Sequence, residues 1–319
     1  MNLNYDVILP VLISFGISVI LSPIIIPFLK KLKFGQFVRD DGPESHLKKS
    51  GTPTMGGLII LCSIVITSLF YVKEYPKLLP ILFVTLGFGL IGFLDDYIKV
   101  VMKRSLGLRA WQKMALQIIV TGVFCYYIMT QTELGTRMMI PFWHGRYLEV
   151  GFWYIPLLFF VVLGTVNGAN FTDGLDGLAS SVTVLIATFF TVVAIGMKAG
   201  IEPITCAAVG ALLGFLVYNV YPARVFMGDT GSLALGGFVA ATAYVLEMPL
   251  FIPIVALVYL VEVLSVIIQV ISFKTTGKRP FKMAPIHHHF ELCGWPETKV
   301  VAIFSIVTTI LCLIGLLAI

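Results

Sequence analysis

The sequence predicts an all-α, polytopic integral membrane protein with ten transmembrane helices and both termini outside. Of its 319 residues, 58% are hydrophobic and only 12% are charged, whereas a soluble domain carries about 25% charged residues. The apolar residues fall in runs of 16 to 25, close to the roughly 20 that a helix needs to cross a hydrocarbon core about 30 Å thick. These observations exclude a soluble fold.

Ten apolar runs are expected to form the spans. The first has no cleavage site of the kind that ends a signal peptide, so it is expected to be a span and not a leader. The eighth and ninth are separated at Glu247, Met248 and Pro249. In chain order the runs are 5–29, 55–72, 78–94, 114–131, 153–169, 178–197, 203–221, 232–247, 249–273 and 299–319.

The positive charges indicate the orientation of these spans. Ten spans place the connecting segments alternately on two faces, and 17 of the 22 Lys and Arg residues lie on or beside one set of them. We call this set the basic loops. Because positive loops stay in the cytoplasm, the basic loops are expected to be cytoplasmic and both termini outside. The basic loops are 30–54, 95–113, 170–177, 222–231 and 274–298.

The remaining composition limits the kinds of partner. A net charge of +5 is too small to suggest nucleic acid, which leaves the lipid bilayer as the predicted surroundings. The five cysteines have no paired spacing, which favours buried small side chains over disulfides or zinc ligands. No repeat or polar linker divides the chain, so residues 1–319 are expected to form one membrane domain.

Unusual polar residues gather in the basic loops, so an active site is expected on the cytoplasmic face. Asp95 and Asp96 are adjacent carboxylates at the end of the third run, where desolvation is costly and a functional role is the default. They suit either a magnesium–diphosphate site or a general base. Lys99 and Lys113 follow closely and could hold phosphate as point charges.

Two further loops carry oxygen ligands. Asn170, Asp173 and Asp176 recur every three residues between the fifth and sixth runs, a spacing that brings side chains to one face of a helical turn. An oxygen-only set favours a hard cation such as Mg²⁺ over zinc. Asp229 lies between two glycines directly before the eighth run, where a helix start could receive an anion.

The first and last basic loops complete the pattern. Lys48 begins a stretch that Gly and Pro interrupt repeatedly, which indicates a shaped loop. His287, His288 and His289 are consecutive, with Glu291 as the one carboxylate beside them. Zinc would need further ligands at suitable spacing, so these histidines are expected to donate hydrogen bonds to phosphate.

Taken in order, these five segments resemble the polyprenyl-phosphate N-acetylhexosamine-1-phosphate transferase superfamily. The resemblance runs from Lys48 to Glu291, and its most discriminating part is Pro280-Phe-Lys-Met-Ala-Pro-Ile-His-His-His-Phe-Glu291, which is similar to the bacterial cell-wall branch. That branch joins UDP-N-acetylmuramoyl-pentapeptide to undecaprenyl phosphate at the inner face of the bacterial cell membrane, giving lipid I and UMP. The resemblance therefore implies an enzyme of peptidoglycan synthesis with Mg²⁺ as cofactor.

Phosphoryl transfer needs positioning and charge neutralisation more than covalent chemistry, and the residue roles follow from that requirement. Asp229, with Asp173 and Asn170, is expected to hold Mg²⁺. Asp95 or Asp96 would orient or deprotonate the lipid phosphate. The expected substrate-binding residues are Lys48, Lys99 and Lys113 for phosphate, Asp176 and Asn219 for the nucleotide sugar, His287, His288 and His289 for the anionic substrate, and also Asn170.

Two alternatives stay open at this point. One is a sister transferase that uses UDP-N-acetylglucosamine. The other is an ion-coupled transporter, which would place ionisable groups near the middle of the membrane, where the sequence clearly has only Glu262, with Gln269 on roughly the same helical face. Glu262 is expected to be a helix contact or a groove wall. The sequence leaves open a covalent intermediate and the oligomeric state, and it is compatible with a homodimer.

Overall fold

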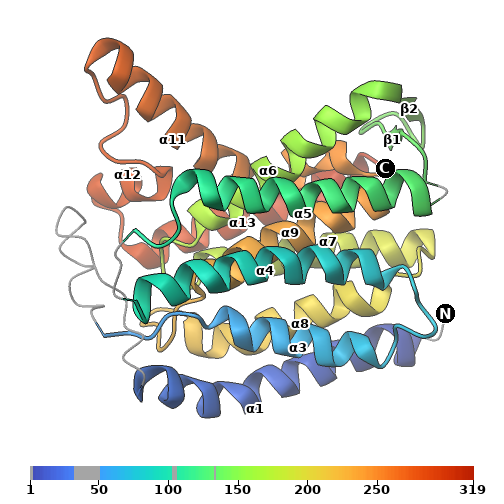
Figure 1. Cartoon of the computed structure of the whole chain (residues 1–319), viewed down its shortest axis with the longest axis horizontal. Helices are drawn as coiled ribbons and strands as arrows, with labels where there is room; N and C mark the ends of the chain where they lie inside the picture. Colours follow the sequence, from blue (N-terminus) through green and yellow to red (C-terminus); the bar gives the residue numbers. More distant parts are fainter. Residues whose placement is uncertain (1–2, 32–50, 103–105, 133) are drawn as a thin grey trace.

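The computed structural model describes residues 3–31, 51–102, 106–132 and 134–319. In these ranges the chain is a bundle of helices, most of which run in roughly the same direction, with α6 and α11 inclined to the rest (Figure 1). Lys48 falls outside the described residues, so its predicted role stays a prediction. The helices of the first half are η1 Leu3–Ile8, α1 Leu9–Lys31, α3 Gly57–Leu69, α4 Leu78–Val100, α5 Ala110–Gln131, η2 Gly151–Trp153 and α6 Tyr154–Thr172.

The elements of the second half are α7 Leu178–Met197, α8 Glu202–Asn219, α9 Gly228–Val245, η3 Pro249–Phe251, α10 Ile252–Val255, α11 Leu257–Thr276, α12 Ile286–Leu292 and α13 Glu297–Leu317. Short pieces lie between the long helices α9 and α11 and between α11 and α13. Helices suit this sequence because a membrane core offers no water to the backbone, so each segment must satisfy its own N–H and C=O groups.

The predicted helical membrane protein is confirmed, and each of the ten apolar runs contains a helix. Eight helices in the described ranges are long and apolar enough to cross a membrane. The other two runs correspond to α3, which has only 13 residues, and to α9, which lies in the middle of the bundle. The expected division between the eighth and ninth runs is present, because α9 ends at Val245 and η3 begins at Pro249.

The structure differs from the prediction in two places. The ninth run is not one helix, since α10 ends at Val255 and α11 begins after a break at Ala256. A small antiparallel hairpin, β1 Arg137–Met139 with β2 Tyr147–Glu149, lies between α5 and α6. Its strands have three residues each, too few for an alternating pattern to stand out in the sequence.

Helix α9 forms the centre of the molecule. Every residue from Thr230 to Val245 is buried, and α3, α4, α6 and α7 pack around it. The approach of α4 is especially close, because a methyl group on Gly92 would overlap the backbone of Asp229. Only glycine allows this crossing, and it brings the last turns of α4 beside the start of α9.

The chain ends and the polar loops lie at opposite ends of the bundle. Both termini are on the right in Figure 1, whereas α12 is on the left, and α11 rises out of the bundle on that side. The start of α9 and the end of α4 belong to the same end as α12. His287 in α12 packs against the loop that follows α6, and Asn170 at the end of α6 is hydrogen-bonded to Asp229 at the start of α9. We call this the site end.

Candidate active site

Side chains from four helices converge at the site end around Asp229, the second residue of α9. Asp95 comes from the last turns of α4, Lys113 from the first turn of α5, and Asn170 from the end of α6. The sequence predicted that these residues share one face of the membrane, and the structure brings them into contact. The contacts decide what each residue could do.

Asp229 is surrounded by groups that stabilise its negative charge. Its Oδ2 accepts hydrogen bonds from Lys99 Nζ at 2.8 Å and from Lys113 Nζ at 3.0 Å. Its Oδ1 accepts one from Asn170 Nδ2 at 2.9 Å. Charge-assisted hydrogen bonds of this kind are about twice as strong as neutral ones. Asp229 is therefore held as a carboxylate between two ammonium groups.

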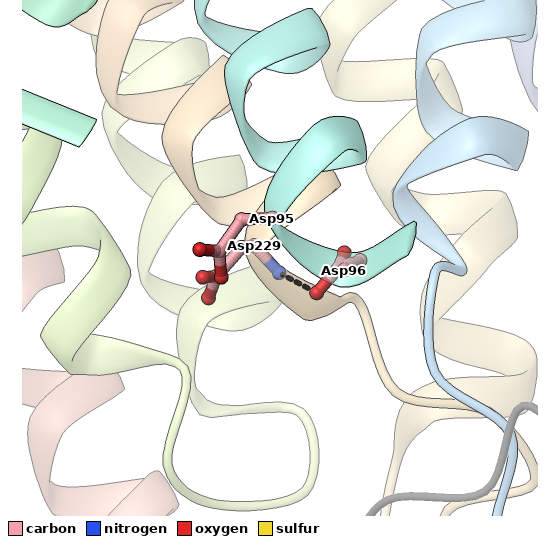
Figure 2. A group of neighbouring side chains, drawn as sticks. All are labelled: Asp95, Asp96 and Asp229. Atoms are coloured by element: carbon pink, nitrogen blue, oxygen red, sulfur yellow. Dashed lines mark hydrogen bonds between the residues drawn. The ribbon is translucent and has the colours of Figure 1, made fainter. Parts of the chain in front are cut away.

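Asp95 lies beside Asp229 and shares a lysine with it. Lys99 Nζ is 2.5 Å from Asp95 Oδ2, and the backbone N–H of Leu108 donates to Asp95 Oδ1 at 2.8 Å. Figure 2 shows the carboxyl groups of Asp95 and Asp229 together, with Asp96 turned to the other side of the α9 start. The two adjacent aspartates therefore have different surroundings.

The side chain of Asp96 is hydrogen-bonded to the start of α9. Its Oδ1 accepts a hydrogen bond from the backbone N–H of Asp229 at 3.2 Å. Its Oδ2 accepts two from Thr230, from the backbone N–H at 2.9 Å and from Oγ1 at 2.6 Å. A carboxylate at a helix N-terminus accepts hydrogen bonds from N–H groups that have no partner in the helix, and its negative charge interacts favourably with the helix dipole. This geometry favours a positioning role for Asp96 over proton transfer.

The donor set is suited to a hard cation. Among the described residues, Asp95, Asp96 and Asp229 form a group of carboxylates that could hold a metal ion, because each offers an oxygen within 4.8 Å of the other two. Oxygen ligands of this type fit Mg²⁺. The predicted ligand Asn170 contacts Asp229 directly, whereas Asp173 is not in this group, so its role as a ligand stays a prediction.

Asp173 is nevertheless close to the site. Desolvation raises the pKa of its carboxyl group well above the usual range, and the nearby charges of Asp229 and Asp96 raise it further. A cation at the site would oppose this effect, because a positive charge favours the ionised form of a neighbouring carboxyl group.

Asp176 and Asn219 use their side chains inside the protein. Asp176 Oδ2 accepts a hydrogen bond from the backbone N–H of Ala223 at 2.9 Å. Asn219 donates to the carbonyl oxygen of Val225 at 3.0 Å and accepts from Ser180 Oγ at 2.8 Å. The Asp176 bond connects the loop after α6 to the segment between α8 and α9, and the Asn219 bonds connect the end of α8 to this segment and to α7. They support a role in shaping the site, and direct binding of a nucleotide sugar by either residue stays a prediction.

The three histidines separate into different environments. His287 is fully buried, whereas His288 and His289 are partly exposed. His288 Nδ1 lies 2.8 Å from Glu291 Oε2, and His289 Nδ1 accepts a hydrogen bond from the backbone N–H of Lys282 at 3.1 Å. The side chains do not converge as zinc ligands would, and binding of an anionic substrate stays a prediction for all three.

Comparisons with known proteins assign the chain to a family. The model of glycosyl transferase family 4 matches residues 78–247, more than half of the chain. Signature 1 of the phospho-N-acetylmuramoyl-pentapeptide-transferases matches residues 49–61. A phospho-N-acetylmuramoyl-pentapeptide-transferase of Clostridium botulinum (strain Alaska E43 / Type E3) is 55% identical over 99% of this chain and 97% of its own length. The chain belongs to the phospho-N-acetylmuramoyl-pentapeptide-transferase family.

Other relatives agree with this assignment. Proteins of the same name from Clostridioides difficile (strain 630) and Clostridium kluyveri (strain NBRC 12016) are 52% and 51% identical. They cover 97% and 98% of this chain, and the matches span 96% and 99% of the relatives. The predicted resemblance to a membrane transferase of cell-wall synthesis is confirmed.

Sequence reasoning missed two side chains that shape the site of this phospho-N-acetylmuramoyl-pentapeptide-transferase family member. Glu297, in the first turn of α13, accepts a hydrogen bond from the backbone N–H of Asp176 at 2.5 Å. Gln117, one turn after Lys113, accepts one from Asn167 Nδ2 at 2.9 Å and so connects α5 to α6. Both partners are distant in sequence, so no local pattern indicates either contact.

Proposed function

We propose that this chain transfers phospho-N-acetylmuramoyl-pentapeptide from its UDP-linked form to undecaprenyl phosphate, giving lipid I and UMP. The observation that carries the proposal is Asp229, held by Lys99 and Lys113 beside Asp95 at one end of an apolar bundle. Two lysine ammonium groups around a carboxylate suit a site that receives diphosphate, and the apolar bundle suits a lipid acceptor. The names of the relatives supply the substrate class.

The chemistry follows from these positions. An oxygen of the lipid phosphate becomes bonded to the phosphorus that carries the sugar, the bond from that phosphorus to the bridging oxygen breaks, and UMP leaves with that oxygen. Lys99 and Lys113 would move onto phosphate oxygens and offset their charge. Asp95 lies where it could orient the lipid phosphate or take its proton, while Asp96 keeps the start of α9 in place.

A divalent cation completes this arrangement. Asp229 is the expected principal ligand, with Asp95 and Asn170 beside it. When bound, Mg²⁺ would neutralise charge on the diphosphate and stabilise the leaving group. Lys99 and Lys113 offset the negative charge of Asp229 itself.

The decisive test is release of UMP by the purified enzyme. We expect release to require both UDP-N-acetylmuramoyl-pentapeptide and undecaprenyl phosphate, as well as Mg²⁺. Replacing the donor by UDP-N-acetylglucosamine should give little UMP. Efficient release from UDP-N-acetylglucosamine would identify the sister transferase instead, and no release from either donor would contradict the proposal.

The topology of the proposal has ten spans, with α3 and α9 included, and places the site end in the cytoplasm of a bacterium. Cys293 tests this orientation, because it directly follows α12 and is the one exposed thiol among the five cysteines. A membrane-impermeant thiol reagent should label Cys293 only after the cells are permeabilised. Cys293→Ser should remove that label, and strong labelling of intact cells would reverse the orientation.

A further inference from the structure

A carboxylate and an imidazole form a fully buried pair between α11 and α12. Glu262 and His287 are each 0% exposed, and Glu262 Oε2 lies 3.1 Å from His287 Nδ1. The first turns of α11 are fixed in place, since the hydroxyl of Tyr259 is hydrogen-bonded to Thr183 on α7. Glu262 is one turn further along, so its carboxylate has a defined position.

This buried pair costs more free energy than a simple contact between helices would require. Burying a carboxylate and an imidazole costs free energy that a packed apolar side chain of similar size avoids. The cost is only partly offset here, because Glu262 Oε1 and His287 Nε2 are buried without a hydrogen-bond partner among the described residues. An ionisable residue inside a membrane segment usually has a function.

The imidazole of His287 leads from Glu262 to the loop after α6. A methyl group on Gly174 would overlap His287 Nε2, so the ring packs directly against the backbone of this glycine. Gly174 lies between Asp173 and Asp176, in the five-residue turn that separates α6 from α7. The other side of this turn is fixed by the Asp176 bonds to Ala223 and Glu297. His287 is therefore the support on the α12 side.

We infer that Glu262 is a positioning residue that acts through His287 to hold the turn Asp173–Gly177 in its binding geometry. By accepting the Nδ1–H of His287, the carboxylate fixes the ring orientation and directs Nε2 toward Gly174, as carboxylates do for histidines that hold other functional groups. Because this turn carries residues expected to bind the metal and the donor nucleotide, the inference rests on the proposed function.

The test compares two substitutions of Glu262 with a matched control. Glu262→Leu removes the acceptor, whereas Glu262→Gln keeps an amide oxygen that can still accept from Nδ1. We expect Glu262→Leu to raise the KM for UDP-N-acetylmuramoyl-pentapeptide by roughly 10-fold or more, with a smaller change in kcat, and Glu262→Gln to lie between it and the unchanged enzyme. Glu247→Gln changes another buried glutamate, which accepts a hydrogen bond from Arg137 in β1 of the hairpin, and should leave this KM unchanged.

Hydrogen exchange provides a second readout that needs no substrate. Peptides covering the turn Asp173–Gly177 should exchange faster in Glu262→Leu and in His287→Ala than in the unchanged enzyme, and Glu247→Gln should have no such effect. In the His287→Ala background, Glu262→Leu should add nothing further. Unchanged exchange, or full addition of the two effects, would overturn the inference. Failure of the proposed function would instead appear as absent UMP release by the unchanged enzyme.

Discussion

Asp229→Asn should lower the rate of UMP release by roughly 10²-fold or more. The amide keeps the size of the side chain but loses the charge that Lys99, Lys113 and a bound cation all require. The half-saturating Mg²⁺ concentration should therefore rise. The measurement is UMP release as a function of Mg²⁺ at saturating concentrations of both substrates.

Glu202→Gln is a suitable control for this experiment. Glu202 lies in the first turn of α8, as Asp229 lies in the first turn of α9, and it is 2% exposed. Both variants should be produced in normal amounts, and only Asp229→Asn should change the Mg²⁺ dependence. Near-full activity of Asp229→Asn at low Mg²⁺ would show that Asp229 is not the main metal ligand.

The helices and the convergence of the site were predictable because they depend on local properties of the sequence. Apolar length defines each span, and the alternation of loops places Asp95, Asn170 and Asp229 on one face. The contact between Asn170 and Asp229 requires, in addition, that α6 and α9 pack together.

The individual roles were less predictable because they depend on how two helices cross. Asp95 and Asp96 are neighbours in the sequence, yet the close approach of α4 to α9 at Gly92 directs only Asp96 to the start of α9. The role of Asp176 was equally hard to predict, since its partners Ala223 and Glu297 come from distant parts of the chain. Charge and spacing indicate a polar residue, but its hydrogen-bond partner depends on the tertiary fold.

The different environments of Asp95 and Asp96 predict different failures for their asparagine variants. Asp95→Asn should lower kcat by roughly 10²–10⁴-fold if Asp95 acts as the base, with little change in either KM or in thermal stability. The variant can keep the hydrogen bond from Leu108. Because a base must be ionised to act, the fall in rate at acidic pH should also become flatter. The measurements are the pH–rate profile and the two KM values.

Asp96→Asn should instead lose both activity and stability. Both carboxylate oxygens of Asp96 accept hydrogen bonds, from Asp229 and from Thr230, so the asparagine amide group must place N–H donors against one of these donors. An unmatched buried donor costs about 1–3 kcal/mol, and the start of α9 would shift together with Asp229. Thermal unfolding should therefore occur at a lower temperature than for Asp95→Asn.

The two variants together decide which carboxylate works on the substrate. The two roles would have to be exchanged if Asp96→Asn were stable and had a flattened acidic limb of its pH–rate profile, while the acidic limb of Asp95→Asn was unchanged. Equal losses of kcat that do not depend on pH would favour an electrostatic role for both carboxylates and remove the base assignment. The geometry predicts that Asp95→Asn impairs the chemical step and that Asp96→Asn displaces the start of α9. The carboxyl group of Asp95 lies beside that of Asp229, whereas the carboxyl group of Asp96 is hydrogen-bonded to the start of the helix that carries Asp229.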